Sequence, residues 1–274
     1  MSLFFTIEKM MKTIIKNLKS NFPKLIFGML YLIVSCNSDN LDDIKSKTGL
    51  EKYLFENKGF TISNELIACA ASQPISEIDY ALYPISVFFL PIAGASDFKY
   101  FECNDANVAI TDYSKFIEKP LTSYPVFNGY LRHFKNNTIN EDVWGIVTYK
   151  VGNVIHISRA IRIKHYTKPT QFAPELITIT NDLTFPRFDW TDGTIPENEI
   201  YFQVVSDTSN NLISGTYTYD KYFKFYDLSN VVLNIRDVTP HPTLSPSTPY
   251  NFLLMSVSID NWVNLIGEKS FITQ

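Results

Sequence analysis

The densest group of side chains that could do acid–base or metal chemistry lies between residues 189 and 199. It holds four carboxylates with a glycine among them: Asp189, Asp192, Gly193, Glu197 and Glu199. Paired carboxylates act as acid and base in glycoside hydrolysis, and hard cations such as Ca²⁺ bind oxygen ligands. The spacing is not that of an EF-hand loop, so we expect a solvated turn rather than a metal site.

Other catalytic signatures are missing from the sequence. It contains no Gly-x-Ser-x-Gly elbow, no glycine-rich phosphate loop and no His-Glu-x-x-His motif. The four histidines are scattered singly, at His133, His156, His165 and His241. Because zinc needs several ligands at short, regular spacings, we predict no zinc site. Since the catalytic and phosphate-binding signatures are also missing, we predict no cofactor and assign no catalytic residue.

Aromatic residues are concentrated between Tyr217 and Tyr226. If this stretch is a strand, alternate residues share a face, so Tyr222 and Tyr226 would lie outside while Phe223 and Phe225 fill the core. Exposed tyrosines can stack on sugar rings or on protein partners. The alternative is that these rings cover the edge of a sheet, and the sequence leaves both interpretations open.

The first 35 residues have the composition of a secretion signal. A basic stretch precedes the apolar stretch 25–34, and the small residue Ser35 follows it. An apolar run of this length is too short to cross a bilayer, which requires about 20 residues. We therefore expect a removable signal peptide over residues 1–35, with Met1, Met10 or Met11 as the start.

The stretch Ile33-Val34-Ser35-Cys36 resembles the lipobox of bacterial lipoproteins. The resemblance implies that the Cys36 thiol receives a lipid and that the signal is cut just before it. The acyl chains would then anchor the chain in the membrane, because several buried chains hold a protein stably. The polar and acidic residues 36–48 would form a flexible tether. The expected location is the bacterial outer membrane, on either its surface or its periplasmic face.

Two further cysteines, Cys69 and Cys103, fall on predicted strands. Export would place them where disulfides persist, so they are a candidate pair. Free cysteine is also among the most buried residue types, which leaves two reduced thiols as the alternative.

Charge and aromatic content restrict the class of protein. Residues 1–35 carry five lysines and one glutamate, so the remainder is more acidic than the net charge of −4 of the whole chain. Because phosphate binding depends on Lys and Arg, we predict no nucleic-acid partner. The 21 Phe and 16 Tyr residues favour strands, so we predict an all-β fold.

Two prolines in the stretch 167–174 mark a boundary between two domains. We expect a β-sandwich over residues 49–168, in which Gly152-Asn153 turns a hairpin between two long strands. A second sandwich is expected over residues 172–274, with about seven strands. The predicted architecture is two tandem immunoglobulin-like sandwiches.

The second part resembles fibronectin type III domains. Trp190, in Phe188-Asp189-Trp190, matches the core tryptophan of their second strand, and Leu244, Pro246 and Tyr250 match the leucine, proline and tyrosine before the sixth. The resemblance implies a tyrosine corner, in which the hydroxyl of Tyr250 bonds back to the backbone. The stretch 222–235 departs from the pattern, because it is long for one strand and contains residues 227–230, which predict a bend or break.

We expect a non-enzymatic, lipid-anchored module that binds a glycan or an envelope protein. One alternative is a hydrolase, or an accessory subunit, that acts on extracellular polysaccharide through the carboxylates of residues 189–199. Another is a purely structural envelope lipoprotein. Fold resemblance alone does not separate these functions.

Overall fold

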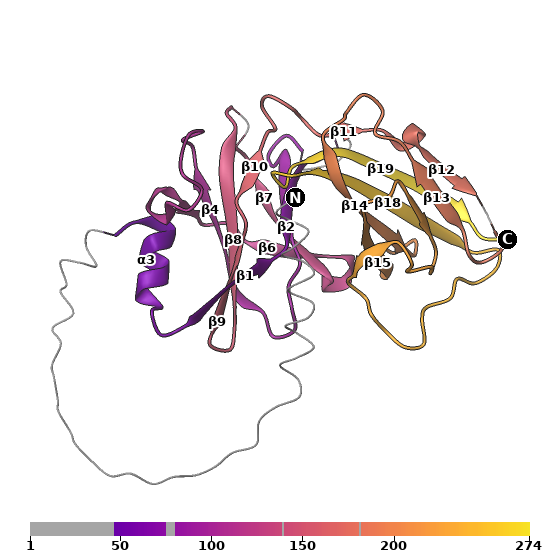
Figure 1. The fold of residues 1–274 in the computed structure, drawn as a ribbon, viewed down its shortest axis with the longest axis horizontal. Helices are drawn as coiled ribbons and strands as arrows, with labels where there is room; N and C mark the ends of the chain where they lie inside the picture. Colours follow the sequence, from indigo (N-terminus) through magenta and orange to yellow (C-terminus); the bar gives the residue numbers. More distant parts are fainter. Residues whose placement is uncertain (1–46, 75–79, 139, 181) are drawn as a thin grey trace, which may run out of the picture. The chain divides into compact units, whose positions relative to one another are not determined.

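The computed structural model describes residues 47–74, 80–138, 140–180 and 182–274. All of them belong to one compact unit. The predicted signal peptide, Cys36 and the tether as far as residue 46 lie outside the described residues. The described chain is mainly strand, which confirms the all-β prediction (Figure 1).

The N-terminal half is a sandwich of two sheets. Sheet A has the order β1-β9-β8-β4-β5, with β10 also paired to β8, and sheet B has the order β2-β3-β7-β6. The strands of sheet A are β1 (Thr61–Leu66), β4 (Ser96–Cys103), β5 (Ile117–Lys119), β8 (Val143–Val151), β9 (Val154–Ser158) and β10 (Ile161–Ile163). Those of sheet B are β2 (Ala68–Ser72), β3 (Ile85–Phe89), β6 (Ser123–Val126) and β7 (Leu131–Asn136).

The C-terminal half is a second sandwich. Sheet C has the order β11-β19-β18-β14-β15-β17, and sheet D has the order β12-β13-β16. The strands of sheet C are β11 (Gln171–Phe172), β14 (Asn198–Ser206), β15 (Leu212–Thr218), β17 (Val231–Asn234), β18 (Pro249–Ser258) and β19 (Val263–Ile272). Those of sheet D are β12 (Ile177–Thr180), β13 (Arg187–Trp190) and β16 (Tyr222–Lys224).

Within the described ranges one α-helix, α3 (Gly49–Glu56), covers sheet A. Leu50 and Tyr53 are three residues apart, so they share one helical face, and both are buried with Phe101, Phe116 and other residues behind them. Three 3₁₀ turns, η1 (Tyr113–Lys115), η2 (Phe127–Gly129) and η3 (Pro174–Leu176), connect strands. No described helix is long and apolar enough to span a membrane.

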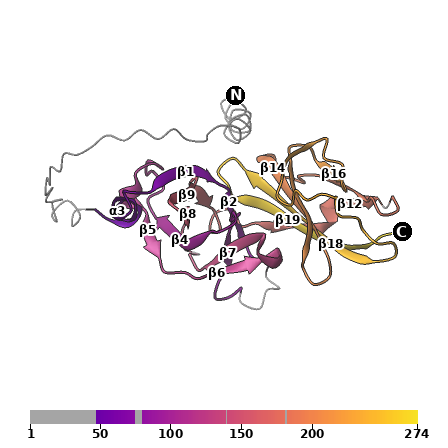
Figure 2. The ribbon, with the colours of Figure 1, turned by 90° about the horizontal axis from the view of Figure 1, so that it is seen from below.

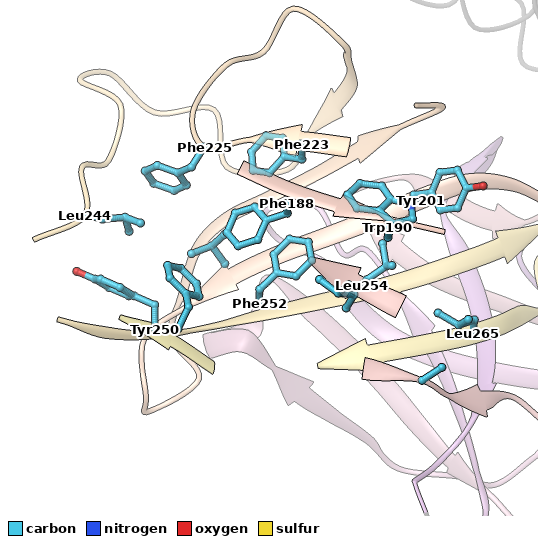
Figure 3. Close-up of a cluster of buried hydrophobic side chains, with 14 of the residues drawn as sticks. Phe188, Trp190, Tyr201, Phe223, Phe225, Leu244, Tyr250, Phe252, Leu254 and Leu265 are labelled. Atoms are coloured by element: carbon cyan, nitrogen blue, oxygen red, sulfur yellow. The ribbon is translucent and has the colours of Figure 1, made fainter. Parts of the chain in front are cut away.

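Each sandwich has its own core. Between sheets A and B, the side chains that point inward from each strand form one buried cluster, which includes Val87, Phe134 and Val147. Between sheets C and D, the rings of Phe188 and Phe252 stack with centroids 3.9 Å apart. Figure 3 shows these two rings in the middle of the C-terminal core.

A third apolar cluster joins the two sandwiches. Phe88 and Leu131 of sheet B pack in it with Phe202 and Met255 of sheet C, and we call this contact the B–C interface. The layers therefore follow one another as α3, A, B, C and D (Figure 2). The sequence predicted two domains in tandem, and in the structure their apolar outer faces are buried against each other.

Trp262 strengthens this connection. It follows β18 in the C-terminal half, yet it is fully buried in the core between sheets A and B. Its backbone bridges to Ala70 of β2, and its indole N–H donates to the carbonyl of Lys168 at 2.9 Å. The C-terminal half thus supplies a large side chain that completes the core of the N-terminal half.

Local turn signals located one hairpin correctly. Val151 of β8 pairs with Val154 of β9 across Gly152. The φ of Gly152 is 54°, in the left-handed region that glycine adopts without strain. The hairpin prediction is confirmed.

Three stretches of strand-forming residues are each divided in the structure. The stretch 65–71 passes from sheet A to sheet B at Ile67, and the stretch 126–134 contains the η2 turn between β6 and β7. The stretch 222–235 breaks between β16 and β17, which confirms the break predicted at residues 227–230, and the chain crosses there from sheet D to sheet C. Because both halves of each stretch are apolar enough to be strand, the pattern alone does not show the change of sheet.

Candidate functional site

A half-open hollow of about 340 Å³ lies at the margin of the B–C interface. We call it the interface hollow, and its lining residues are Pro125, Val126, Phe127, Ser206, Asn210, Asn251, Leu253 and Glu268. The first three come from β6 and η2 of the N-terminal half, and the others come from β14, β18, β19 and the turn after β14. Both sandwiches are therefore needed to form it.

The turn that carries the Phe127 wall has an unusual backbone. Phe127, Asn128 and Gly129 all have positive φ, at 49°, 49° and 87°. Left-handed backbone costs a non-glycine residue about 1–2 kcal/mol, and it persists where packing holds it. Here Phe127 and Tyr130 pack against the cluster of the B–C interface, which fixes the turn.

The polar lining comes from amides, a hydroxyl and one carboxylate. The hydroxyl of Ser270 donates to Oδ1 of Asn251 at 2.8 Å, which orients the Asn251 side chain and presents its amide N–H groups as donors. Asn210 lies in a turn stabilised by Asp207, whose pKa is lowered by hydrogen bonds from the side chain and backbone of Asn211. Glu268 is exposed on β19. The hollow can therefore both donate and accept hydrogen bonds.

The carboxylates of residues 189–199 do not converge on the interface hollow, since none of them lines it. Asp189 accepts bonds from Arg187 at 2.8 and 3.0 Å, and Glu197 pairs with Lys168, which lowers the pKa of Glu197. Glu199 is exposed on β14. Among the described residues, no three metal-ligating side chains come together.

Asp192 has a structural role in its loop. Burial alone would raise its pKa, but hydrogen bonds from Lys221, Asn198 and Tyr201 outweigh that effect and lower it. The ammonium of Lys221 lies 2.5 Å from Oδ2, and the Tyr201 hydroxyl donates to Oδ1 at 2.8 Å. The charged carboxylate thus ties the loop after β13 to β14.

The two tyrosines predicted to bind ligand do not form a ladder. The guanidinium of Arg187 lies 4.1 Å from the ring centre of Tyr222 on the outer face of sheet D. Tyr226 lies beyond the end of β16, and its hydroxyl donates to the carbonyl of Arg236 at 3.0 Å. Phe223 and Phe225 are buried as predicted. Ligand binding by Tyr222 and Tyr226 stays a prediction.

The residues that carried the family resemblance lie in the C-terminal core. Trp190, Leu244 and Tyr250 are all buried, and Trp190 packs beside Tyr201 (Figure 3). The hydroxyl of Tyr250 accepts a hydrogen bond from the backbone N–H of Ser245 at 2.9 Å, so it does bond back to the chain just upstream.

Cys69 and Cys103 are free thiols on different sheets. Cys69 packs at the B–C interface, and Cys103 lies in the cluster beneath α3. Burial raises the pKa of the Cys69 thiol to about 12. Of the two alternatives that the sequence left open, the structure has the reduced pair.

Sequence reasoning missed a serine–histidine contact near the boundary between the sandwiches. The Ser72 hydroxyl lies 2.7 Å from Nδ1 of His165, and the backbone N–H of Thr170 donates to the same hydroxyl at 3.1 Å. Burial lowers the pKa of His165 although Asp142 opposes the shift. Ser72 is buried and does not line the interface hollow, so this contact fastens the linker to β2.

Comparison of the sequence with protein-family models and with curated proteins finds no match.

Proposed function

We propose that the chain is a lipid-anchored protein of the bacterial cell envelope whose two-sandwich body is a non-enzymatic binding module. The observation that carries the proposal is the interface hollow, to which both sandwiches contribute. Concave sites between domains, with apolar walls and a few polar groups, are typical ligand sites. Residues that hold the two halves together thereby also hold the shape of the site.

Hydrolysis fits this hollow less well than binding. An acid and a base are needed for glycoside hydrolysis, and Glu268 is the one carboxylate among the described lining residues. The carboxylates that the sequence offered as catalytic groups are held elsewhere, Asp189 by Arg187 and Asp192 by Lys221. The Asp189 pair lies within β13, and the Asp192 pair joins the loop after β13 to the residue before β16.

The proposed anchor is Cys36 with its preceding signal-like stretch. Acylation there would place the two-sandwich body outside the cytoplasm, on the surface or the periplasmic face of the outer membrane. The support for this part comes from the sequence.

We also propose that residues 172–274 form a fibronectin type III-like domain. Support comes from the strand order, because β12, β13 and β16 form one sheet and β15, β14, β18 and β19 follow one another in the facing sheet. The buried Trp190 and the bond from Ser245 to Tyr250 add to it. The N-terminal sandwich has a different order, with a parallel pair of β1 and β9.

The binding proposal is tested by blocking the hollow. Full-length chain in mild detergent is used to capture envelope glycans and proteins, and the captured ligand is compared for Glu268→Trp and Ile272→Trp. Both residues are exposed on β19 and differ by an even number of positions, so their side chains share a face. Glu268 lines the hollow and Ile272 does not.

We expect Glu268→Trp to abolish capture, because a bulky ring fills the hollow, while Ile272→Trp keeps it. Equal capture by both variants would place binding elsewhere. If the unmodified chain captures no ligand, the alternative of a purely structural envelope lipoprotein is favoured.

A further inference from the structure

We infer that the ligand of the interface hollow is a neutral saccharide, with one sugar ring lying against Phe127. The inference rests on the proposed binding function and names the chemical class of its ligand. It follows from the charge of the lining, from its mixture of donors and acceptors, and from the strands that form its walls.

The charge of the lining argues against an anionic ligand. No Lys, Arg or His occurs among the described residues that line the hollow, and Glu268 brings a single negative charge. Phosphate, sulfate and uronic acid groups are normally held by cations or by clusters of backbone N–H groups. A neutral ligand needs neither of these.

The hydrogen-bonding groups match hydroxyls. The Asn251 amide presents donors, because its oxygen is already bonded by Ser270. Glu268 is an acceptor, while Asn210 and Ser206 can both donate and accept. A sugar hydroxyl is also donor and acceptor at once, so neighbouring hydroxyls can satisfy this mixed set.

The opposite wall is apolar. Pro125, Val126 and Phe127 face a hollow whose other apolar contributor is Leu253. A pyranose ring has a face of C–H groups that packs against such surfaces. The fixed turn at residues 127–129 positions the Phe127 wall in advance, which reduces the entropy lost on binding.

A peptide added to a sheet edge fits the same place less well. One edge strand at the hollow is β6, which lies at the end of sheet B and pairs with β7. Its residue Pro125 has no N–H, so an added strand could not complete its hydrogen bonds there. The remaining lining comes from β14, β18, β19 and the turn after β14. β14 and β18 have partners on both sides, whereas β19 pairs with β11 at Leu265 and Ile266, short of Glu268, so the peptide library tests that edge.

The test is a glycan array and calorimetric titration with the full-length chain in mild detergent. Neutral oligosaccharides, uronate-containing oligosaccharides and polyamines are compared with a library of envelope peptides. We expect neutral oligosaccharides to bind and the charged ligands to bind at least about tenfold more weakly, a difference of about 1.4 kcal/mol.

Three variants locate the contact. Phe127→Ala should weaken binding about tenfold, through loss of the apolar wall. Asn210→Gly removes an amide at a residue whose φ is 61°, where glycine is unstrained, and should weaken binding about fivefold. The control is Ser247→Gly, also at a positive φ of 51° but outside the lining, and it should leave affinity unchanged.

Glu268→Gln separates a neutral ligand from a cation. A saccharide keeps an oxygen acceptor there and should lose less than about tenfold in affinity, whereas a polyamine would lose its only counter-charge. If peptides bind, and if Phe127→Ala and Asn210→Gly abolish that binding, the saccharide inference is wrong and the binding function stands. If no class of ligand binds, both fail.

Discussion

At the scale of single residues, polar side chains in this protein are used to fix backbone. Tyr250 accepts from Ser245, Asp192 binds Lys221 and Tyr201, and Ser72 is bonded by Thr170. Each bond links segments at the edge of a core, where apolar packing alone does not fix the backbone. Three of the four carboxylates of residues 189–199 are likewise paired with basic side chains, while the amides and the carboxylate of the interface hollow line its wall.

Cys36 carries the prediction at this scale. Replacing it with alanine should abolish labelling by a radioactive or clickable fatty acid and release the chain from the membrane fraction, because the thiol is the proposed acylation point. Cys69→Ala is the control, since that thiol packs at the B–C interface. Labelling that survives Cys36→Ala would exclude the lipobox interpretation.

At the scale of elements, connections decide where each strand lies. The loop after β13 leads from sheet D to sheet C and is held to β14 through Asp192. The η2 turn likewise reverses the chain between β6 and β7 and presents Phe127 to the hollow. Strand residues form the cores. These loops align neighbouring strands, and the η2 turn also supplies a wall of the interface hollow.

The Asp192 loop predicts a pH dependence of stability. The folded state lowers the pKa of this carboxyl below its ordinary value, so its stabilisation is complete above about pH 4 and is lost as the pH falls through the lowered pKa. Urea denaturation between pH 6 and pH 2.5 should therefore show a steeper acid loss of unfolding free energy for the unmodified chain than for Asp192→Asn. Identical slopes would show that the carboxylate is not stabilised by its partners.

At the scale of the whole molecule, the two sandwiches share buried surface. The B–C interface and the insertion of Trp262 into the N-terminal core make each half depend on the other. A ligand in the interface hollow would contact both, so binding would stabilise both together.

Trp262→Ala tests this dependence. The change should leave a cavity between sheets A and B and cost about 3–5 kcal/mol of unfolding free energy. Both halves should lose stability in the same transition, measured by hydrogen exchange of amides in β3 and in β14. Loss confined to β3, in the half where the cavity forms, would contradict the coupling. Trp144→Ala is the control, because that indole is only partly buried and lies outside this core.

The sequence by itself determined the class of fold and much of its local structure. The Phe and Tyr content predicted a mainly β fold, Gly152-Asn153 predicted a hairpin that is present, and the resemblance to fibronectin type III domains implied a backbone bond to Tyr250 that is also present. These signals act over a few residues, so they are visible without tertiary contacts. The anchor at Cys36 also rests on such a local pattern and stays a prediction.

Only the tertiary structure decided where strands change sheet, how the sandwiches pack and where the hollow lies. Phe127 and Glu268 are far apart in sequence, and nothing in either neighbourhood indicates the other. Similarly, α3 is short, and its apolar face is recognisable only once sheet A lies beneath it. Burial between distant segments depends on which faces meet, and short-range periodicity does not encode that choice.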